Sequence, residues 1–314
     1  MSNPDISLVM SVYNGEEFLE TTIESVLKQT FTNFEFIISN NGSTDETSAI
    51  IQKFKKIDGR IIFFDHENFG FANSLNQAIA LAKSNLIGRI DADDIMLPER
   101  LAKQFSYLQE NQDISLTSCL AYYINQDGKR IGKTFSDIDT IDINKDYISK
   151  GEPIGLLHPG AMFYKNAFTH VGGYREQFAP AEDIDLWNRF NDHEYWSSVQ
   201  QEYLMEYRMI YGTEIGQNFK KSRIKYEWLR DCMRLRRQGK EEIDWDDFLI
   251  KRNNISPIMK INRYRKMQAK YLYRMAGIHF GANQIFSFLI SLVGSMFLQP
   301  SYFYKKLSNQ IYND

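Results

Sequence analysis

Leu86-Ile87-Gly88-Arg89-Ile90-Asp91-Ala92-Asp93-Asp94 is the stretch of this 314-residue chain that is most informative about its fold. Its apolar first half is followed at once by three aspartates within four residues. A short apolar run that ends in polar turn residues is typical of a buried strand in a parallel sheet. Ligands of such sheets bind beyond the carboxyl ends of the strands, so the aspartates are expected to line a binding crevice.

On both sides of this stretch, apolar runs alternate with helical patterns. The apolar runs before it predict strands at 6–12, 34–39 and 61–64. Helical spacing predicts helices at 17–29, about 45–54 and 71–82. Pro98 opens another predicted helix, since its missing N–H costs nothing in a first turn. The alternation indicates an α/β fold in which helices cover both faces of a mostly parallel sheet.

From about residue 115 this alternation ends. Asp127-Gly128 predicts a hairpin turn, and further short strands are expected at 160–164 and 205–209. Helical patterns dominate from about residue 217 to the end.

The charged side chains are distributed unevenly along the chain. Residues 1–218 carry 18 basic and 32 acidic side chains, whereas residues 219–314 carry 19 basic and 8 acidic ones. Residues 251–306 include ten Lys or Arg and no Asp or Glu. This region is expected to meet an anionic partner, either a membrane surface or a nucleic acid. It has no nucleic-acid recognition motif, so a nucleic-acid partner is not expected.

Residues 285–298 are mostly apolar but shorter than the ~20 residues that a membrane span needs. Two alternatives stay open, a helix that packs in the core and a helix that lies in the membrane interface. The surrounding Lys and Arg favour the interface and predict peripheral membrane contact through 251–306. Two widely spaced cysteines and an N-terminus without a signal-peptide pattern predict a cytoplasmic protein, peripheral on the inner face of the cytoplasmic membrane if that contact forms.

The acidic segment after the apolar run is a candidate metal site. Asp91 and Asp93, two residues apart at a strand tip, can both reach one divalent cation, and oxygen ligands suit Mg²⁺ or Mn²⁺. The alternative is that an aspartate caps the following helix. Capping leaves the other acids repelling one another, whereas a cation relieves the repulsion. His158, held extended by Pro159, is a further candidate ligand, with a structural hydrogen bond as its alternative role.

Two other segments carry candidate chemistry. Asp183 lies near the start of a predicted helix, where a carboxylate suits a general base or merely complements the helix dipole. The segment at 40–45 (NNGSTD) follows the second strand, and its side-chain amides suit the edge of a nucleobase. Signature motifs of nicotinamide dehydrogenases, ATPases, zinc proteins and serine hydrolases do not occur in the sequence.

Taken in order, these segments resemble glycosyltransferase family 2. The resemblance covers about residues 5–210 and is strong because the pieces occur as an ordered set. The matching segments are 9–15 (VMSVYNG), 42–45 (GSTD), 68–70 (NFG), 75–78 (LNQA), 88–95 (GRIDADDI), 97–101 (LPERL), 158–163 (HPGAMF), 171–175 (VGGYR) and 181–187 (AEDIDLW).

The resemblance implies a GT-A fold, with a Rossmann-like sheet, and an enzyme of bacterial capsule, O-antigen or exopolysaccharide synthesis. Such an enzyme moves a sugar from a nucleotide-sugar, here a UDP-sugar, to a hydroxyl of a saccharide or lipid-linked acceptor with inversion. Asp93 would bind Mn²⁺ or Mg²⁺, and Asp91 would contact the metal or the ribose. Asp183 would be the general base, and Glu182 would orient it or the acceptor. The residues expected to bind the nucleotide-sugar are Ser11, Tyr13, Asn14, Glu16, Asn40, Asn41, Gly42, Asn68, Asn73, Arg89, Asp91 and Ala92.

By the same resemblance, residues 1–115 form the nucleotide-sugar-binding half and 116–212 the acceptor-binding half of one domain. Residues 213–314 form a basic helical C-terminal region. Asn40 and Asn41 depart from the family, which usually has an Asp there to accept from the base, so two alternatives stay open: weaker recognition of the base and a donor other than a UDP-sugar. Two rival functions stay open: a sugar nucleotidyltransferase, which would want a basic Gly-rich loop where this chain is acidic, and a non-catalytic nucleotide- or sugar-binding module.

Overall fold

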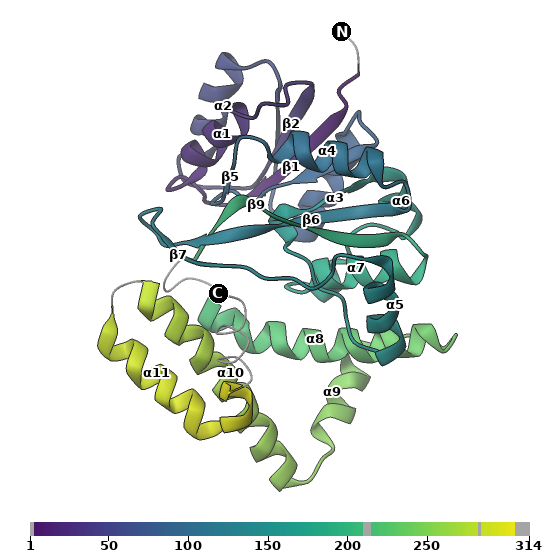
Figure 1. The fold of residues 1–314 in the computed structure, drawn as a ribbon, viewed down its shortest axis with the longest axis vertical. Helices are drawn as coiled ribbons and strands as arrows, with labels where there is room; N and C mark the ends of the chain where they lie inside the picture. Colours follow the sequence, from purple (N-terminus) through teal and green to yellow (C-terminus); the bar gives the residue numbers. More distant parts are fainter. Residues whose placement is uncertain (1–2, 210–214, 282–283, 305–314) are drawn as a thin grey trace. The chain divides into compact units, whose positions relative to one another are not determined.

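The computed structural model describes residues 3–209, 215–281 and 284–304 (Figure 1). The chain divides into two compact units. Unit 1 comprises Met1–Tyr123 and Gly132–Arg208, and unit 2 comprises Ile124–Ile131 and Met209–Asp314. Our division at residue 115 stays a prediction.

Within the described residues the strands form one nine-stranded sheet in the order β3-β2-β1-β4-β8-β6-β9-β5, with β7 paired to β6. The first four strands of this order run parallel. Their bounds are β1 Ile6–Val12, β2 Phe34–Asn41, β3 Ile61–His66 and β4 Leu86–Arg89. All residues of β1 and β2 are buried, as expected for strands covered on both faces. The predicted parallel α/β core is confirmed.

The sheet continues with antiparallel pairing, which explains why the strand–helix alternation ends near residue 115. β8 is antiparallel to both β4 and β6, and β5 is antiparallel to β9. The predicted hairpin at Asp127-Gly128 is confirmed, because it joins the paired strands β6 and β7. The bounds are β5 Ile95–Met96, β6 Ile114–Ile124, β7 Arg130–Lys133, β8 Met162–Tyr164 and β9 Trp196–Arg208.

Helices cover both faces of the parallel strands, as the sequence predicts (Figure 1). Successive side chains of a strand point to opposite faces. Leu8 therefore packs in one core cluster with Ile23 of α1, and Val9 packs in another with Leu75 of α3. The helices of this unit are α1 Leu19–Leu27, α2 Thr47–Ile57, α3 Phe71–Leu81, α4 Arg100–Glu110, α5 Ile141–Lys150, α6 Lys165–His170 and α7 Glu182–Asp192, with 3₁₀ turns η1 His158–Gly160 and η2 Glu176–Phe178.

The C-terminal region is helical, as predicted. Its helices are α8 Ile215–Arg237, α9 Trp245–Asn253, α10 Pro257–Gly281 and α11 Ile285–Leu298. Asp244 caps α9 by accepting from the backbone N–H groups of Asp246 and Asp247. Among the described residues, no helix combines the length and apolar character needed to cross a membrane.

Candidate active site

The three aspartates after β4 lie together on a tight turn. Asp91, Asp93 and Asp94 each offer a carboxylate oxygen, and these oxygens lie within 4.8 Å of one another. Arg208, the last residue of β9, fixes the turn. Its backbone N–H donates to Asp94 Oδ1 at 2.9 Å, and its Nε donates to the carbonyl of Asp93 at 2.8 Å. Arg208 could not be predicted from a local pattern, because its position depends on pairing between strands far apart in the chain.

These aspartates are held in an unfavourable electrostatic state. Burial, with repulsion from Asp91, raises the pKa of Asp93 to about 6. Burial and repulsion from Asp93 and Asp91 raise the pKa of Asp94 well above its usual value. Asp94 Oδ2 is also buried without a hydrogen-bond partner among the described residues. A divalent cation would remove both costs, so this all-oxygen donor set fits Mg²⁺ or Mn²⁺.

Arg89, the last residue of β4, is a buried cation next to these aspartates. Its Nη2 lies 2.6 Å from Asp91 Oδ1, and its guanidinium sits over the ring of Phe71 with 5.3 Å between centres. Burial alone would lower the pKa of Arg89, but the charge of Asp91 raises it. Its Nε and Nη1 have no hydrogen-bond partner in the part of the chain that the structure describes. Arg89 therefore retains donors for an anionic ligand.

Asp183 and Glu182 open α7, and their charges interact with that of Arg89. Burial raises the pKa of Asp183 to about 6. Burial, together with repulsion from Asp183, raises the pKa of Glu182 to about 8. Neighbouring carboxyls with separated pKa values are the usual arrangement for an acid–base pair.

His158 packs among aromatic side chains and does not belong to the cluster of three aspartates. Its Nε2 is hydrogen-bonded to the Tyr174 hydroxyl at 2.8 Å, and its ring meets the edges of Phe71 and Trp187. Burial, and then the charge of Arg89, lower its pKa well below the usual value, so the imidazole is neutral. Within the described residues, the three aspartates are the only cluster of side chains that could together hold a metal ion. A metal-ligand role for His158 stays a prediction.

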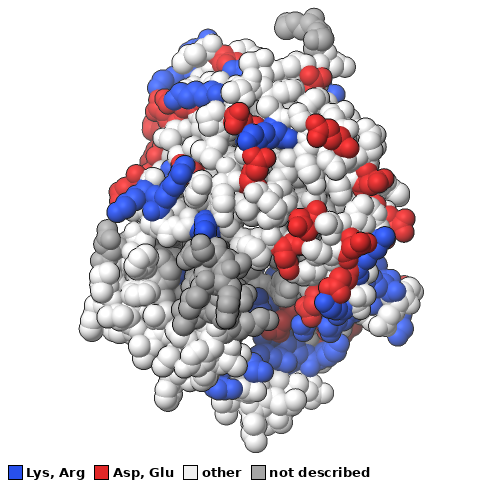
Figure 2. Space-filling view, viewed as in Figure 1, with Lys and Arg blue, Asp and Glu red and all other residues white. Residues whose placement is uncertain are grey.

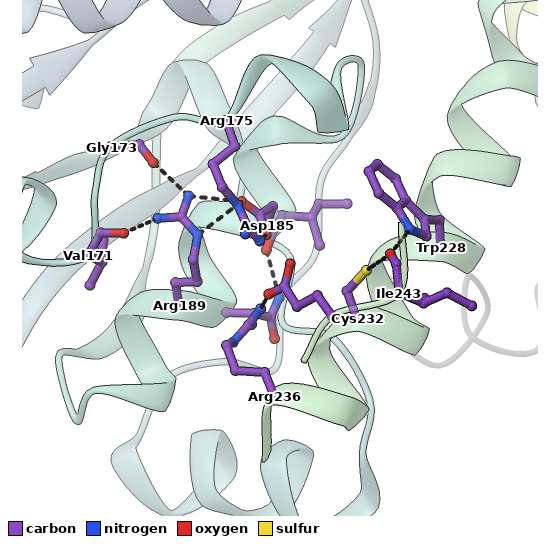
Figure 3. A network of polar contacts seen from close by, with 12 residues as sticks. Val171, Gly173, Arg175, Asp185, Arg189, Trp228, Cys232, Arg236 and Ile243 are labelled. Atoms are coloured by element: carbon purple, nitrogen blue, oxygen red, sulfur yellow. Dashed lines mark hydrogen bonds and ion pairs between the residues drawn. The ribbon is translucent and has the colours of Figure 1, made fainter. Parts of the chain in front are cut away.

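The second aspartate of the EDIDLW segment has a structural position instead. Figure 3 shows the side chains of Arg175 and Arg189 converging on Asp185, which is 1% exposed. Both Nε atoms donate to Asp185 Oδ2, at 2.9 and 3.0 Å. The remaining Arg189 nitrogens donate to the carbonyls of Val171 and Gly173. This cluster fastens the segment that carries Tyr174 to α7, and so positions Tyr174 and Asp183 together.

The loops after β1 and β2 hold one another. Asn14 Oδ1 accepts from the backbone N–H of Thr44 at 2.8 Å. Glu16 Oε2 accepts from that of Glu46 at 3.0 Å. Asn14 and Glu16 therefore join the two loops, while Tyr13, which precedes them at the end of β1, is 54% exposed. Tyr13, Asn14 and Glu16 are all exposed, and Tyr13 is the one of the three with an aromatic ring to offer a ligand.

The two asparagines at the end of β2 also make internal contacts. Asn41 Oδ1 accepts from the backbone N–H of Phe69 at 2.9 Å. Asn40 is paired in register with Asp65 of β3, and its Nδ2 donates to Asp65 Oδ1 at 2.8 Å. Asp65 is exposed and was missed by the sequence reasoning. It places a carboxylate beside Asn40, and the only sequence signal for it was an acidic residue at the end of the third predicted strand.

The remaining predicted binding residues shape the loops around the crevice. Ser11 Oγ donates to Ser74 Oγ at 2.7 Å, and the carbonyl of Ala92 accepts from Thr22 Oγ1 at 2.9 Å. Gly42 has φ +74, and a Cβ there would lie 2.8 Å from the backbone nitrogen of Asn68. Only glycine fits this close approach.

Asn68 and Asn73 complete the loop between β3 and α3. Asn68 Oδ1 accepts from the backbone N–H of Gly70 at 3.0 Å, and Asn73 Nδ2 donates to the carbonyl of Phe69 at 3.0 Å. Glu176 of η2 also accepts from the backbone N–H of Asn73 at 3.2 Å. A carboxylate thus caps α3 from a distant part of the chain, which no local pattern indicates.

Solved structures define the class of this fold as GT-A. Staphylococcus aureus TarS residues 1–349, solved with UDP, superposes with a TM-score of 0.59 at 14% identity, covering 95% of this chain and 92% of that one. The mannosyltransferase PcManGT of Pyrobaculum calidifontis, solved with GDP-Man and Mn²⁺, superposes with a TM-score of 0.57 at 13% identity. This superposition covers 99% of this chain and 81% of that one. The predicted fold class is confirmed.

Sequence comparison identifies the family. Residues 7–172 match the model of glycosyl transferase family 2. The chain is 34% identical over 212 residues to an uncharacterised glycosyltransferase of Methanocaldococcus jannaschii, 67% of this chain and 72% of that protein. It is 32% identical over 185 residues to the O-antigen biosynthesis glycosyltransferase WbnJ of Escherichia coli, 59% of this chain and 70% of that protein. The chain belongs to glycosyltransferase family 2 and is a glycosyltransferase.

Proposed function

We propose that this enzyme is an inverting glycosyltransferase that moves a sugar from a UDP-sugar to an acceptor hydroxyl in bacterial surface polysaccharide synthesis. One observation carries the proposal. Two acidic groups, the aspartates after β4 and the pair at the start of α7, both interact electrostatically with the buried Arg89. The aspartates after β4 suit the binding of a cation that carries a diphosphate. The pair at the start of α7 suits removal of a proton from an acceptor hydroxyl.

In this proposal Asp91 and Asp93 hold Mn²⁺ or Mg²⁺. The raised pKa of Asp93 and the short distances among the carboxylate oxygens support this assignment. The bound cation would stabilise the charge of the nucleoside diphosphate leaving group. Arg89, with two buried nitrogens that lack hydrogen-bond partners among the described residues, donates to an oxygen of the same donor.

Asp183 acts as the general base. Its pKa of about 6 keeps it mostly ionised at neutral pH and leaves it basic enough to accept the proton of a sugar hydroxyl. Glu182, with a pKa of about 8, is protonated and donates a hydrogen bond to the acceptor. Deprotonation of the hydroxyl by Asp183 allows it to attack the anomeric carbon opposite the leaving diphosphate, which inverts that centre.

The nucleoside lies over the ends of β1 and β2. Tyr13 offers an exposed ring to the base, and Asp65 offers a carboxylate oxygen to a base N–H. Residues 1–115 then bind the donor, and residues 116–212 bind the acceptor. TarS has been solved with UDP and UDP-GlcNAc, which supports a uridine donor, whereas PcManGT has been solved with GDP-Man.

The name of WbnJ supports a role in O-antigen or related polysaccharide synthesis, with a saccharide or lipid-linked acceptor. We further propose that α11 contacts an anionic membrane surface. Phe286, Val293 and Phe297 on this helix are 78%, 58% and 83% exposed. Exposed apolar side chains within a basic segment suit the membrane interface. Flotation with phosphatidylglycerol vesicles should carry the wild type upward and leave a Phe286→Ser, Phe297→Ser variant at the bottom.

Thermal unfolding with a panel of nucleoside diphosphates tests the donor site. A ligand at about 100 times its Kd adds ~2.7 kcal/mol of stability. We expect UDP with Mn²⁺ to raise Tm, and Asp93→Ala to lose the effect. Binding without sugar transfer from any donor would favour the non-catalytic module. No shift with any nucleotide would refute the donor site.

A further inference from the structure

Unit 2 contains a cavity that shares no residue with the carboxylate site. It has a volume of about 740 Å³ and lies among α8, α9 and α10, which run along three sides of a triangle in Figure 1. Its wall is formed mainly by charged side chains with a smaller apolar part. The lining residues with a formal charge are Arg223, Glu227, Arg230, Asp231, Lys251, Arg252, Arg263, Lys266 and Lys270.

The wall carries a large excess of positive charge. Seven of its charged residues are Lys or Arg and two are acidic. Both acids are already paired, Asp231 with Lys251 at 2.9 Å and Glu227 with Arg252 at 2.8 Å. Figure 2 shows Lys and Arg side chains gathered over this part of the molecule. Cations crowded around one cavity repel each other, and a polyanionic ligand would offset that repulsion.

One arginine of the wall retains an unused donor. Arg230 Nε is buried and has no hydrogen-bond partner among the described residues. Leaving a buried charged donor unsatisfied costs free energy, which an acceptor oxygen entering the cavity would recover. Arg263, which also lines the cavity, is held in place because its Nη1 donates to the carbonyl of Arg252 at 2.7 Å. Arginines fixed in this way bind phosphate oxygens strongly and with defined geometry.

The apolar part of the wall narrows the class of ligand. Phe248, Ile255, Met259 and Met267 line the same cavity. A ligand that satisfies the whole wall carries both a phosphate group and some apolar surface.

We propose that this cavity binds the phosphate or diphosphate group of a phosphorylated compound. The compound is either a lipid that presents its headgroup or a phosphorylated molecule free in solution. The proposal goes beyond the transfer reaction and does not depend on it, because its residues belong to unit 2 alone.

The test uses the full chain as Asp93→Ala in EDTA, so that the proposed metal-dependent donor site does not contribute. Titration calorimetry measures the binding of inorganic pyrophosphate. Flotation measures binding to vesicles of phosphatidylcholine with and without phosphatidic acid. The cavity variant is Arg263→Gln with Lys266→Gln. The matched control is Lys260→Gln with Arg265→Gln, on the same helix, with the same charge change and outside the cavity wall.

We expect the cavity variant to weaken binding about tenfold or more and the control to change it less than about threefold. Cavity-dependent binding of pyrophosphate without binding of phosphatidic acid vesicles identifies a soluble ligand, and cavity-dependent binding of those vesicles identifies a lipid headgroup. No binding of either probe, or equal losses in both variants, overturns the proposal. If the double variant fails to fold, Arg230→Lys replaces it. That change keeps the charge but removes the guanidinium Nε, and unaltered binding would likewise overturn the proposal.

Discussion

Arg89 Nη2 lies 2.6 Å from Asp91 Oδ1, with the arginine 1% exposed and the aspartate 29% exposed. The same arginine lowers the pKa of Asp93, Glu182 and Asp183, so one buried charge acts on both acidic groups. Arg89 therefore opposes the effect of burial on the pKa of the proposed base, and it is also paired with an aspartate of the proposed metal site.

Replacing Arg89 with methionine should shift the pH dependence of catalysis. Without its charge the pKa of Asp183 rises further above about 6. The acid limb of kcat/KM should move upward by about one pH unit. Arg89→Lys, which keeps the charge, should move the limb less. An unchanged limb in Arg89→Met would contradict this account of the base.

Asp183→Asn should abolish transfer and yet stabilise the fold. Folding raises the pKa of Asp183 from its ordinary value of 3.8 to about 6, so the folded state favours the protonated carboxyl. The stability that this carboxyl contributes is therefore fully present below pH 3.8 and is lost as the pH rises through about 6. In EDTA at pH 8 the ionised wild type should thus unfold more easily than the variant, by about 1–3 kcal/mol. Urea unfolding measures the predicted gain in stability, and a transfer assay measures the predicted loss of activity. Sugar transfer at the wild-type rate by Asp183→Asn would disprove the assignment of Asp183 as the base.

Asp185→Asn should have the opposite effect on stability. Asp185 is buried between two arginines that hold its pKa below the usual value, although burial alone would raise it. Removing its charge leaves Arg189 buried without its ion pair, which should cost about 3–5 kcal/mol in urea unfolding at pH 7. Equal stability of Asp185→Asn and wild type would show that the cluster in Figure 3 does not fasten α7.

Asp65→Asn should weaken nucleotide binding through the base. An exposed carboxylate oxygen accepts from a base N–H, whereas the amide that replaces it has a donor group and no charge. We expect the Kd for UDP, measured by calorimetry with Mn²⁺, to rise about fivefold to thirtyfold. Glu67→Gln, two residues along and also exposed, serves as the control. An unchanged Kd in Asp65→Asn would remove Asp65 from the base site.

The parallel core could be predicted because its signals are local. Each buried strand is an apolar run, and the polar segments 13–16, 40–45 and 91–94 follow these runs directly. The rule that ligands bind at the carboxyl ends of parallel strands then places the acidic turn at the crevice. Antiparallel pairing beyond residue 115 was not predictable in this way, because it joins strands such as β4 and β8 that are far apart in sequence.

Within the site, the sequence by itself determined which residue types were present and which turn would carry the aspartates. Only the tertiary structure decided their separate roles. Asp183 and Asp185 are two residues apart on α7, but one faces Arg89 while the other is enclosed by Arg175 and Arg189. Asp65 likewise gains its position only through pairing with β2. The physical reason is that the environment of a carboxylate, and hence its pKa, depends on charges and burial supplied by distant segments, which no local pattern encodes.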